Sequence, residues 1–352
     1  SSHPQHPSGT KPRLVLVLAT FPKLSETFLV SKFLGLLARG WDVHIGCHQF
    51  NREVWGQFPE LANHPVLKKR MHQRWPSQPH WLAALLFLPA LISTFVKAPR
   101  QTWRYGVHGW QRFGWGVFKH FYLDAALIAL KPDILHFEFG SLAVGKMYLK
   151  EILETKLSVS FRGYDLNYIG LDQDDYYQAV WESLDSAHFL GQDLWERAQR
   201  RGAPEDLTHV LIPPAIDLPL FPQKNSRRDG ILGSMNHPLR ILSVGRLHWK
   251  KGYEFTIQAV KKLQDKGIHC VYEIIGDGDY KAALYFARHQ LGLDAVVEFC
   301  GGLTYEQVIK HLEKADVFLH GAVSEGFCNA VLEAQAMELP VVCTDADGLS
   351  EN

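Results

Sequence analysis

The sequence has no surplus of charge and no paired-cysteine motif. Its 352 residues contain 37 Lys and Arg and 37 Asp and Glu, so no global field favours nucleic acid as a partner. No C-x-x-C spacing occurs, and most of the cysteines fall in apolar, strand-like or helix-starting contexts, which predicts reduced thiols in a cytoplasmic protein. The five cysteines are Cys47, Cys270, Cys300, Cys328 and Cys343.

Motifs for several cofactors and for secretion are missing too. Glycine is absent from Arg13 to Lys23, so the first apolar run is not followed by the G-x-G-x-x-G turn of dinucleotide-dependent oxidoreductases. None of the 18 histidines belongs to an H-E-x-x-H motif, and we expect no metal site. Residues 1–11 lack the apolar core of a signal peptide and are interpreted as a disordered leader.

Short apolar runs alternate with helical patterns along the chain. This alternation predicts an α/β protein with two doubly wound parallel sheets. Ser25 is a plausible N-cap and Gly40 a plausible C-terminal stop for the first helix. The expected strands are 13–19, 42–47, 133–139, 156–161, 187–190, 239–245, 269–275, 296–300, 316–320 and 340–344, and the expected helices are 25–39, 174–184, 252–266, 279–291, 304–315 and 328–338.

A charged, Gly-bearing stretch at 223–238 interrupts the alternation and predicts a linker. We therefore expect an N-terminal domain at 12–222 and a C-terminal domain at 239–352. The second series stops soon after a strand, which suggests that the C-terminal domain is incomplete. Because ligands bind at the carboxyl ends of parallel strands, we expect a site in a cleft between two facing sheets.

The segment from Ser324 to Ala334 carries the clearest functional signal. Glu325 and Glu333 flank a glycine turn that leads into a helical pattern, with an apolar run on either side. A helix N-terminus there would present free backbone N–H groups to a ligand. The two carboxylates can accept hydrogen bonds from several hydroxyls of one molecule. The pattern indicates a nucleotide-sugar site.

Basic and glycine-rich turns follow other strands of the second half. Arg246 comes after a buried run that ends at Gly245, and Lys251 opens the next helix, which suits a diphosphate, although a solvated basic loop is the alternative. Gly276 and Gly278 form a turn that either lines the nucleotide pocket or is a plain tight turn. Gly302 lies in a further turn whose backbone could reach a nucleobase.

Taken in order, these motifs resemble the retaining glycosyltransferases of family 4, which have the GT-B fold. The segment Phe21–Phe28 is similar to the exopolysaccharide subgroup of that family, of the colanic-acid type. The residues that carry the likeness are Gly245-Arg246-Leu247, Lys251-Gly252, Gly276-Asp277-Gly278, Glu325-Gly326-Phe327, Glu333-Ala334, Pro340-Val341-Val342 and Gly348-Leu349-Ser350-Glu351.

The resemblance implies a role for each donor-side residue. Arg246 and Lys251 would hold the donor diphosphate, Glu333 the ribose hydroxyls, and Glu325 the donor sugar. The reaction would transfer a hexose with retention from a UDP-sugar, or less favourably a GDP-sugar, to a polysaccharide precursor, lipid-linked sugar or other glycan. It would need no cofactor and no metal, since cations of the chain supply the positive charge. The remaining donor-binding positions would be Gly245, Gly276, Gly278, Gly302, Gly326, Phe327, Cys328 and Asn329.

The first half departs from the family pattern. Arg162 stands where the family often has a histidine, and an arginine cannot act as a base at neutral pH, so we expect it to bind a sugar hydroxyl or phosphate. The usual Gly-Gly turn is replaced by Thr20-Phe21-Pro22-Lys23. His136 and Glu138 alternate on one expected strand and either line the acceptor side or belong to the core. The acceptor-side candidates are Ser25, Glu26, His136, Glu138 and Asp165, the last of which could orient Arg162.

The longest apolar run, Trp81 to Val96, is sixteen residues long and contains Pro89. It is too short for a confident membrane span. Flanking cations and tryptophans over 75–115 suit an interfacial anchor at the inner face of a membrane, and a buried helix pair is the alternative.

Two other functions stay open. The chain could be a GT-B enzyme of another reaction, such as a nucleotide-sugar epimerase or a small-molecule glycoside synthase. It could also be a non-catalytic protein that binds a membrane surface.

Overall fold

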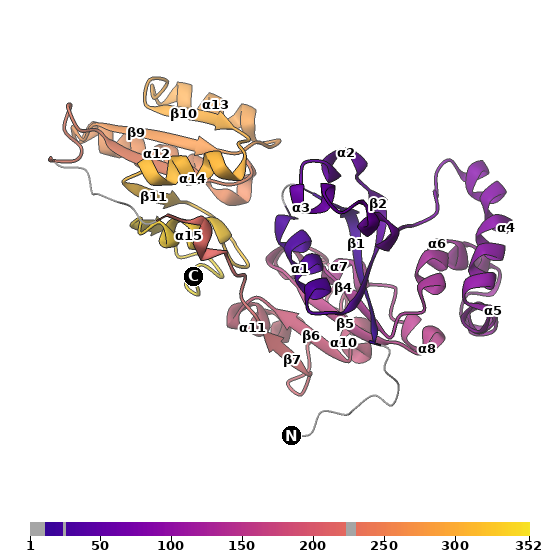
Figure 1. Ribbon diagram of the computed structural model, residues 1–352. Helices are drawn as coiled ribbons and strands as arrows, with labels where there is room; N and C mark the ends of the chain where they lie inside the picture. Colours follow the sequence, from indigo (N-terminus) through magenta and orange to yellow (C-terminus); the bar gives the residue numbers. More distant parts are fainter. Residues whose placement is uncertain (1–10, 24–25, 223–229) are drawn as a thin grey trace. The chain divides into compact units, whose positions relative to one another are not determined.

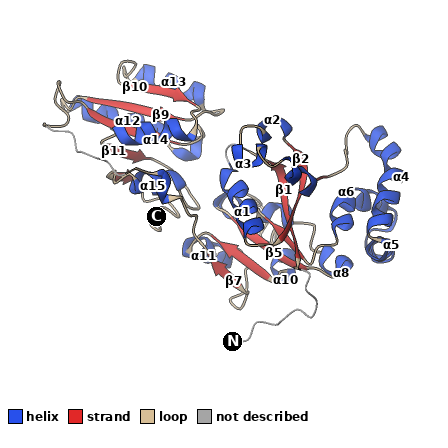
Figure 2. Cartoon of the chain, in the orientation of Figure 1, coloured by secondary structure: helices blue, strands red, loops and turns tan. Residues whose placement is uncertain are grey.

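The computed structural model describes residues 11–23, 26–222 and 230–352, which form two compact units. The first comprises the chain up to Phe189 together with Ala198–Val210, and the second comprises Leu190–Arg197 and Leu211–Asn352. Each is a parallel sheet covered by helices (Figures 1 and 2). The predicted fold class, two doubly wound α/β domains, is confirmed. The expected leader up to residue 10, the N-cap Ser25 and the part of the linker at 223–229 lie outside the described residues.

The first sheet has the strand order β3-β2-β1-β4-β5-β6-β7. Its central strand β1 is a continuous apolar run, and Val15 to Leu18 are all buried, as expected for a strand with helices on both faces. The strands are β1 (Arg13–Phe21), β2 (Asp42–Phe50), β3 (Met71–Gln73), β4 (Ile134–Phe137), β5 (Lys156–Phe161), β6 (Ser186–Phe189) and β7 (His209–Leu211).

Helix α1 (Thr27–Ala38) packs Leu29, Val30 and Phe33 against β1 and β2. It ends as predicted at Gly40, which has φ +82° and donates its N–H to the carbonyl of Leu37. The other helices of the first unit are α2 (Arg52–Trp55), α3 (Pro59–Ala62), η2 (Pro65–Arg70), α4 (His80–Lys97), α5 (Pro99–Phe113), η3 (Gly114–Gly116), α6 (Val117–Leu130), α7 (Gly140–Ala143), α8 (Leu149–Leu153), α9 (Gly163–Asn167) and α10 (Gln178–Ser183), and α11 (Gln192–Arg200) runs across the division between the units.

The second sheet has the strand order β10-β9-β8-β11-β12, and every neighbouring pair is parallel. Helices α12 and α13 pack on one face of the sheet, and α14 and α15 pack on the other. The elements are η4 (Leu218–Leu220), β8 (Leu239–Val244), η5 (Trp249–Lys251), α12 (Tyr253–Asp265), β9 (Cys270–Ile275), α13 (Lys281–Gln290), β10 (Val297–Gly301), α14 (Tyr305–Lys314), β11 (Val317–His320), α15 (Asn329–Ala336) and β12 (Val341–Cys343).

Each sheet has one topological switch point. In the second unit the chain moves from β8 outward to β9 and β10 and then crosses to β11 on the other side of β8. In the first unit it moves from β1 to β2 and β3 and then crosses to β4. The loops that follow β8 and β11, and those that follow β1 and β4, therefore diverge and leave room for ligands.

Two local expectations are corrected by the structure. The helix expected at 174–184 is shorter and spans Gln178–Ser183. A buried helix pair was the alternative expected for 81–96. The outer face of α4 contradicts it, because only Ala90 and Thr94 of this helix are buried. These two residues pack towards α6, while Trp81, Leu85 and Val96 are more than half exposed.

Two glycines that flank α12, Gly252 before it and Gly267 after it, allow a stability test of the second unit. Both have positive φ, +59° at Gly252 and +75° at Gly267, but a Cβ at Gly252 would lie 1.9 Å from the carbonyl oxygen of Gly321, whereas a Cβ at Gly267 would meet no atom within 4 Å. We expect Gly267→Ala to lower the free energy of unfolding by about 1 kcal/mol through left-handed strain alone. Gly252→Ala should lower it by about 3 kcal/mol or more, because the loop after β11 must also shift. Urea unfolding of the two variants and the wild type measures the difference, and equal losses would contradict the close approach of the two loops.

Candidate functional site

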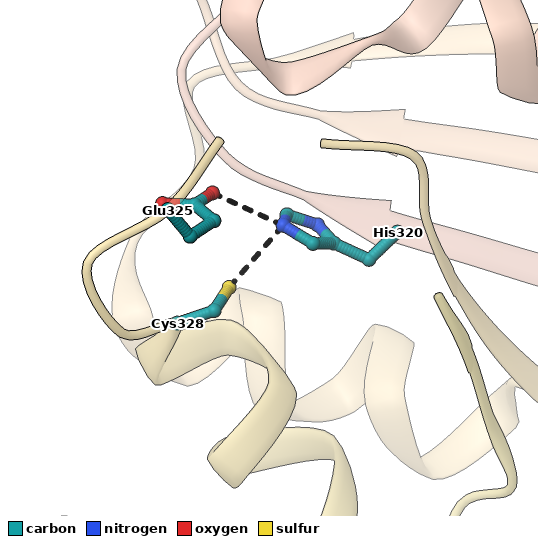
Figure 3. A group of neighbouring side chains, drawn as sticks. All are labelled: His320, Glu325 and Cys328. Atoms are coloured by element: carbon teal, nitrogen blue, oxygen red, sulfur yellow. Dashed lines mark hydrogen bonds and ion pairs between the residues drawn. The ribbon is translucent and has the colours of Figure 1, made fainter. Parts of the chain in front are cut away.

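Glu325 is the centre of a buried charged cluster in the second unit. It lies in the loop between β11 and α15, and its side chain is only 6% exposed. The Lys251 ammonium, at the end of η5, forms an ion pair with Glu325 Oε1. His320, the last residue of β11, places its Nε2 3.1 Å from the same oxygen (Figure 3). The loops after β8 and β11 thus meet at one carboxylate.

The electrostatics of the cluster favour the ionised carboxylate. Burial alone would raise the pKa of Glu325, but the charge of Lys251 and the hydrogen bonds from His320 and Lys251 lower it to about 2. Burial would lower the pKa of His320, yet its hydrogen bonds with Cys328 and Glu325 raise it to about 9. Burial also lowers the pKa of the Lys251 ammonium, whereas the charge of Glu325 and its hydrogen bond raise it. The net effect is that the pKa of Lys251 is raised. At neutral pH the cluster holds one anion between two cations.

Cys328 completes a group of potential metal ligands. Its Sγ lies 3.5 Å from His320 Nε2, and the ligand atoms of Cys328, His320 and Glu325 are all within 4.8 Å of one another. A metal ion would have to displace Lys251 from the carboxylate and a proton from His320. The expectation of a metal-independent site stays a prediction.

The N-terminus of α15 offers donors beside this cluster. Cys328 is the N-cap residue, and its own N–H is occupied because it donates to Asn352 Oδ1 at 3.0 Å. The N–H groups of Asn329 and Ala330 donate to no described residue. Two free amides at a helix N-terminus can bind an anion. Of the expected backbone donors, Asn329 is therefore available, and Cys328 is engaged.

Arg246 lies on the exposed loop after β8 and has no ion pair among the described residues. The loop itself is fixed, because the Tyr253 hydroxyl donates to the carbonyl of Gly245 at 2.9 Å. Burial lowers the pKa of the Lys251 ammonium and the charge of Arg246 lowers it further, while the charge of Glu325 raises it. A ligand anion would relieve this repulsion.

The glycines after β9 are explained by packing. A Cβ at Gly276 would lie 1.9 Å from the carbonyl oxygen of Gly245, and one at Gly278 would lie 2.2 Å from that of Leu247. The tight-turn alternative therefore accounts for both residues without a ligand, and a role in donor binding stays a prediction. Gly302, by contrast, faces open space.

Glu333 lies on α15, two turns after Glu325. Burial raises the pKa of its carboxyl to about 7, although a hydrogen bond from the Tyr305 hydroxyl, 3.5 Å from Oε1, lowers it in part. Unlike Glu325 it has no cation as a partner among the described residues. Glu333 is thus half ionised at neutral pH and available to a ligand. Gly326 and Phe327, between the two glutamates, are partly exposed.

A second buried carboxylate, Glu138, lies just past the end of β4 in the first unit. Its side chain is 0% exposed, with Lys32 Nζ 2.6 Å from Oε1 and Arg162 Nη2 3.1 Å from Oε2. Burial raises the pKa of Glu138, but interactions with His136, Lys32 and Arg162 outweigh it and lower this pKa to about 2. His136 lies 3.6 Å from Glu138 Oε1, and burial together with Lys32 lowers the pKa of its imidazole to about 3, so it is neutral. The site has a net positive charge.

The orienting role expected for Asp165 needs correction, while the role expected for Arg162 stays a prediction. Asp165 does not orient the guanidinium: its carboxylate is buried and accepts hydrogen bonds from the backbone N–H groups of Arg162 and Ser141. Glu138 orients it instead, since Arg162 Nε donates to the Glu138 carbonyl and Nη2 to its carboxylate, while the guanidinium lies 4.2 Å from the Phe28 ring centroid. Glu26 pairs with Lys23 at 3.0 Å. Ser25 is outside the described residues.

Several residues of both sites were missed by the sequence analysis. Lys32 and His320 carried no motif, although His320 ends a predicted strand and Lys32 sits in a predicted helix after the first strand. Tyr253 and Tyr305 are at helix starts after candidate turns. A search for polar residues at the ends of predicted strands would have found His320 and also Ser160, whose Oγ lies 2.9 Å from His136 Nε2.

Comparisons with known proteins found similar glycosyltransferases. The family described as glycosyl transferases group 1 matches residues 228–352. The chain is 26% identical to the putative colanic acid biosynthesis glycosyltransferase WcaL of Escherichia coli over 95% of its length and 82% of that protein. It is 25% identical to the amylovoran biosynthesis glycosyltransferase AmsK of Erwinia amylovora over 96% of its length and 84% of that protein.

The solved structures similar to the chain establish its fold. The Anabaena protein HepE in complex with UDP-glucose superimposes with a TM-score of 0.63 at 15% identity, covering 96% of this chain and 82% of that one. The apo lipopolysaccharide outer core galactosyltransferase WaaB superimposes with a TM-score of 0.59 at 12% identity. The resemblance to GT-B glycosyltransferases of the exopolysaccharide subgroup is confirmed, and the chain is a glycosyltransferase.

The pKa of His320 predicts a pH-dependent stability. The pKa is about 9 in the folded protein and near 6.5 when unfolded, so the stabilisation is complete below pH 6.5 and is lost as pH rises through 9. We expect the wild type to lose up to about 3 kcal/mol more than His320→Gln between pH 6 and pH 10. Urea unfolding at both pH values measures this difference. Parallel losses in the two proteins would show that His320 is not a charged partner of Glu325.

Because Glu138 is buried, its substitution should lower the free energy of unfolding more than the substitution of Glu26 does. Glu138→Gln leaves Lys32 and Arg162 without a counterion and should lower the free energy of unfolding by about 3 kcal/mol. Glu26→Gln, which breaks the ion pair with Lys23, is the matched control and should cost about 0.5 kcal/mol or less. Chemical unfolding of both variants tests the comparison, and similar costs would contradict the buried cluster.

Proposed function

We propose that the chain transfers a hexose, with retention at the anomeric carbon, from a nucleoside-diphosphate sugar to a glycan acceptor. One observation carries the proposal: the loops after β8 and β11 bring Lys251, Glu325 and the free amides of α15 to the same end of the second sheet. This arrangement offers positive groups for a diphosphate beside carboxylates for hydroxyls. It fits the order of motifs of glycosyltransferase family 4.

Different residues bind the diphosphate of the donor and its sugars. Arg246, Lys251 and the N–H groups of Asn329 and Ala330 bind the diphosphate, since a cation and a helix N-terminus both favour anions. Glu333 accepts hydrogen bonds from the ribose hydroxyls. Glu325 faces the sugar while Lys251 and His320 keep it ionised. UDP is the favoured nucleotide, and the complex of HepE with UDP-glucose supports this choice over GDP.

The reaction exchanges one bond at the anomeric carbon. The bond to the diphosphate oxygen breaks, an acceptor oxygen forms the new bond on the same face, and the acceptor proton passes to the departing phosphate. Arg246 and Lys251 stabilise the negative charge that develops on the leaving group. Because these cations supply the charge, we propose that the reaction proceeds without a metal.

The acceptor binds at the first unit. The cluster of Lys32, Arg162 and Glu138 carries a net positive charge at the end of β4 and β5, with the neutral His136 beside it. Such a site suits a sugar acceptor with hydroxyl or anionic groups. The names of WcaL and AmsK support a polysaccharide precursor or a lipid-linked sugar as the acceptor class. The five free cysteines are consistent with a cytoplasmic reaction.

A panel of nucleotide sugars tests the proposal. Thermal unfolding with UDP-, GDP- and ADP-sugars, each in the presence of EDTA, should show concentration-dependent stabilisation by one of them. We expect the largest shift with a UDP-sugar and slow release of UDP on prolonged incubation. No stabilisation by any nucleotide sugar, with or without added Mg²⁺, would contradict a donor site. Stabilisation that requires Mg²⁺ would contradict the metal-independent mechanism alone.

The pKa of Glu333 predicts how donor affinity depends on pH. The carboxyl has a pKa of about 7 and must be ionised to accept two hydroxyl hydrogen bonds, so affinity for UDP-glucose should rise about tenfold from pH 6 to pH 8. UDP-glucose is the probe because its diphosphate diester does not titrate in this range. Isothermal titration calorimetry measures the affinity.

Two variants serve as controls for this test. Glu333→Gln should bind more weakly and show no such rise. Tyr305→Phe should shift the rise to higher pH, because the hydrogen bond that lowers the pKa of Glu333 is lost. An affinity that is independent of pH in the wild type, or unchanged in Glu333→Gln, would refute the ribose role.

A further inference from the structure

A continuous apolar stripe runs along the outer face of α4 in the first unit. The exposed side chains recur at helical spacing, so they lie in one row. The opposite face of the helix is held to α6, where the Thr94 hydroxyl lies 3.5 Å from the carbonyl of Ala125. The stripe comprises Trp81, Leu85, Leu88, Ile92, Phe95 and Val96, each between 52% and 76% exposed.

An open groove adjoins this stripe between α4 and α5. It has a volume of about 560 Å³ and is lined mainly by Leu91, Phe95, Trp103, Val107 and Trp110. Trp103 and Trp115 are 72% and 79% exposed at its margin. Exposed apolar surface of this extent marks an interaction site in a folded protein. Tryptophan with flanking cations is typical of the membrane–water interface.

The charge of this region is of one sign. Residues 61–123 contain nine Lys and Arg and no Asp or Glu. Arg100 and Arg104 pair with a single carboxylate, Glu154 of α8. The side chains of Lys97, Arg112 and Lys119, on α4, α5 and α6, are exposed and have no ion pair among the described residues. The apolar surface is therefore bordered by unneutralised cations.

This charge distinguishes between the possible partners. A symmetric contact with a second copy would place the same cationic surface against itself, which is repulsive. The length and composition of α4 alone would allow a membrane span, but a span is disfavoured because one face of the helix is packed on α6. An anionic bilayer surface matches both the apolar stripe and the cations.

We propose that α4 and α5 dock the enzyme on an anionic membrane. In this arrangement the α4 stripe and the tryptophans enter the headgroup region, the α4–α5 groove receives acyl chains, and Lys97, Arg112 and Lys119 meet the lipid phosphates. The surface shares no residue with either charged cluster. Docking would bring the enzyme to the place where a lipid-linked acceptor is found.

Flotation of the purified full chain with lipid vesicles tests this inference. The wild type should bind vesicles of phosphatidylcholine with 30% phosphatidylglycerol at least tenfold more strongly than pure phosphatidylcholine. The double variant Ile92→Asp/Phe95→Asp should lose at least tenfold in binding to both. Arg112→Glu/Lys119→Glu should lose the preference for the anionic lipid, which raised salt should also weaken in the wild type.

Matched controls lie on the second unit. Phe286→Asp on α13 changes a side chain that is 65% exposed, and Lys262→Glu/Lys310→Glu changes two exposed cations. These variants should bind vesicles like the wild type. All variants should bind UDP-glucose in solution like the wild type, so a failure of the donor proposal is distinguishable from a failure of this one.

Three outcomes would overturn the inference. The first is the absence of binding to anionic vesicles. The second is an equal loss in the controls and in the α4–α5 variants. The third is a concentration-dependent dimer in sedimentation velocity that Ile92→Asp/Phe95→Asp abolishes, because the occupant of the groove would then be a second copy.

Discussion

The buried ion pair between Lys251 and Glu325 is the constraint on which the candidate donor site depends. A carboxylate that is 6% exposed stays ionised only because Lys251 and His320 pair with it. That pairing ties the loop after β8 to the loop after β11 across the switch point of the sheet. The two loops supply Arg246 on one side and the N-terminus of α15 on the other. A change that neutralises the pair therefore affects both loops of the candidate donor site together.

The first unit also contains a buried carboxylate that is paired with two cationic groups. Glu138 is fully buried at the end of β4, and Lys32 and Arg162 pair with it from α1 and from the end of β5. In both units one carboxylate orients two cationic groups at the carboxyl ends of parallel strands. The two clusters differ in the hydrogen-bond donors that remain available to a ligand. The candidate donor site keeps an exposed Arg246 and free helix amides, whereas Arg162 donates from Nε and Nη2 to Glu138 and its side chain is largely covered.

Much of the fold could be predicted from the sequence, because short apolar runs bounded by Gly or charged residues mark parallel strands. Every strand and helix of the second sheet was placed to within two residues, and the motifs located Arg246, Lys251 and Glu325. Partners distant in the chain could not be predicted. Nothing local shows that Lys32 meets Glu138, that Asn352 occupies the Cys328 N–H, or that Gly276 is needed for contact with Gly245. The outer face of α4 was ambiguous, since composition alone does not show which side is covered.

We propose that a nucleotide sugar binds at the carboxyl end of the second sheet, against the loops joined by Lys251 and Glu325. Hydrogen–deuterium exchange of the full chain with saturating UDP-glucose tests it most directly, because it reports each backbone segment separately. Exchange should become slower in Arg246–Gly252 and in Phe327–Val331, where the free amides of α15 lie. Saturable binding that leaves both segments unprotected, or that protects only the first unit, would contradict this proposal.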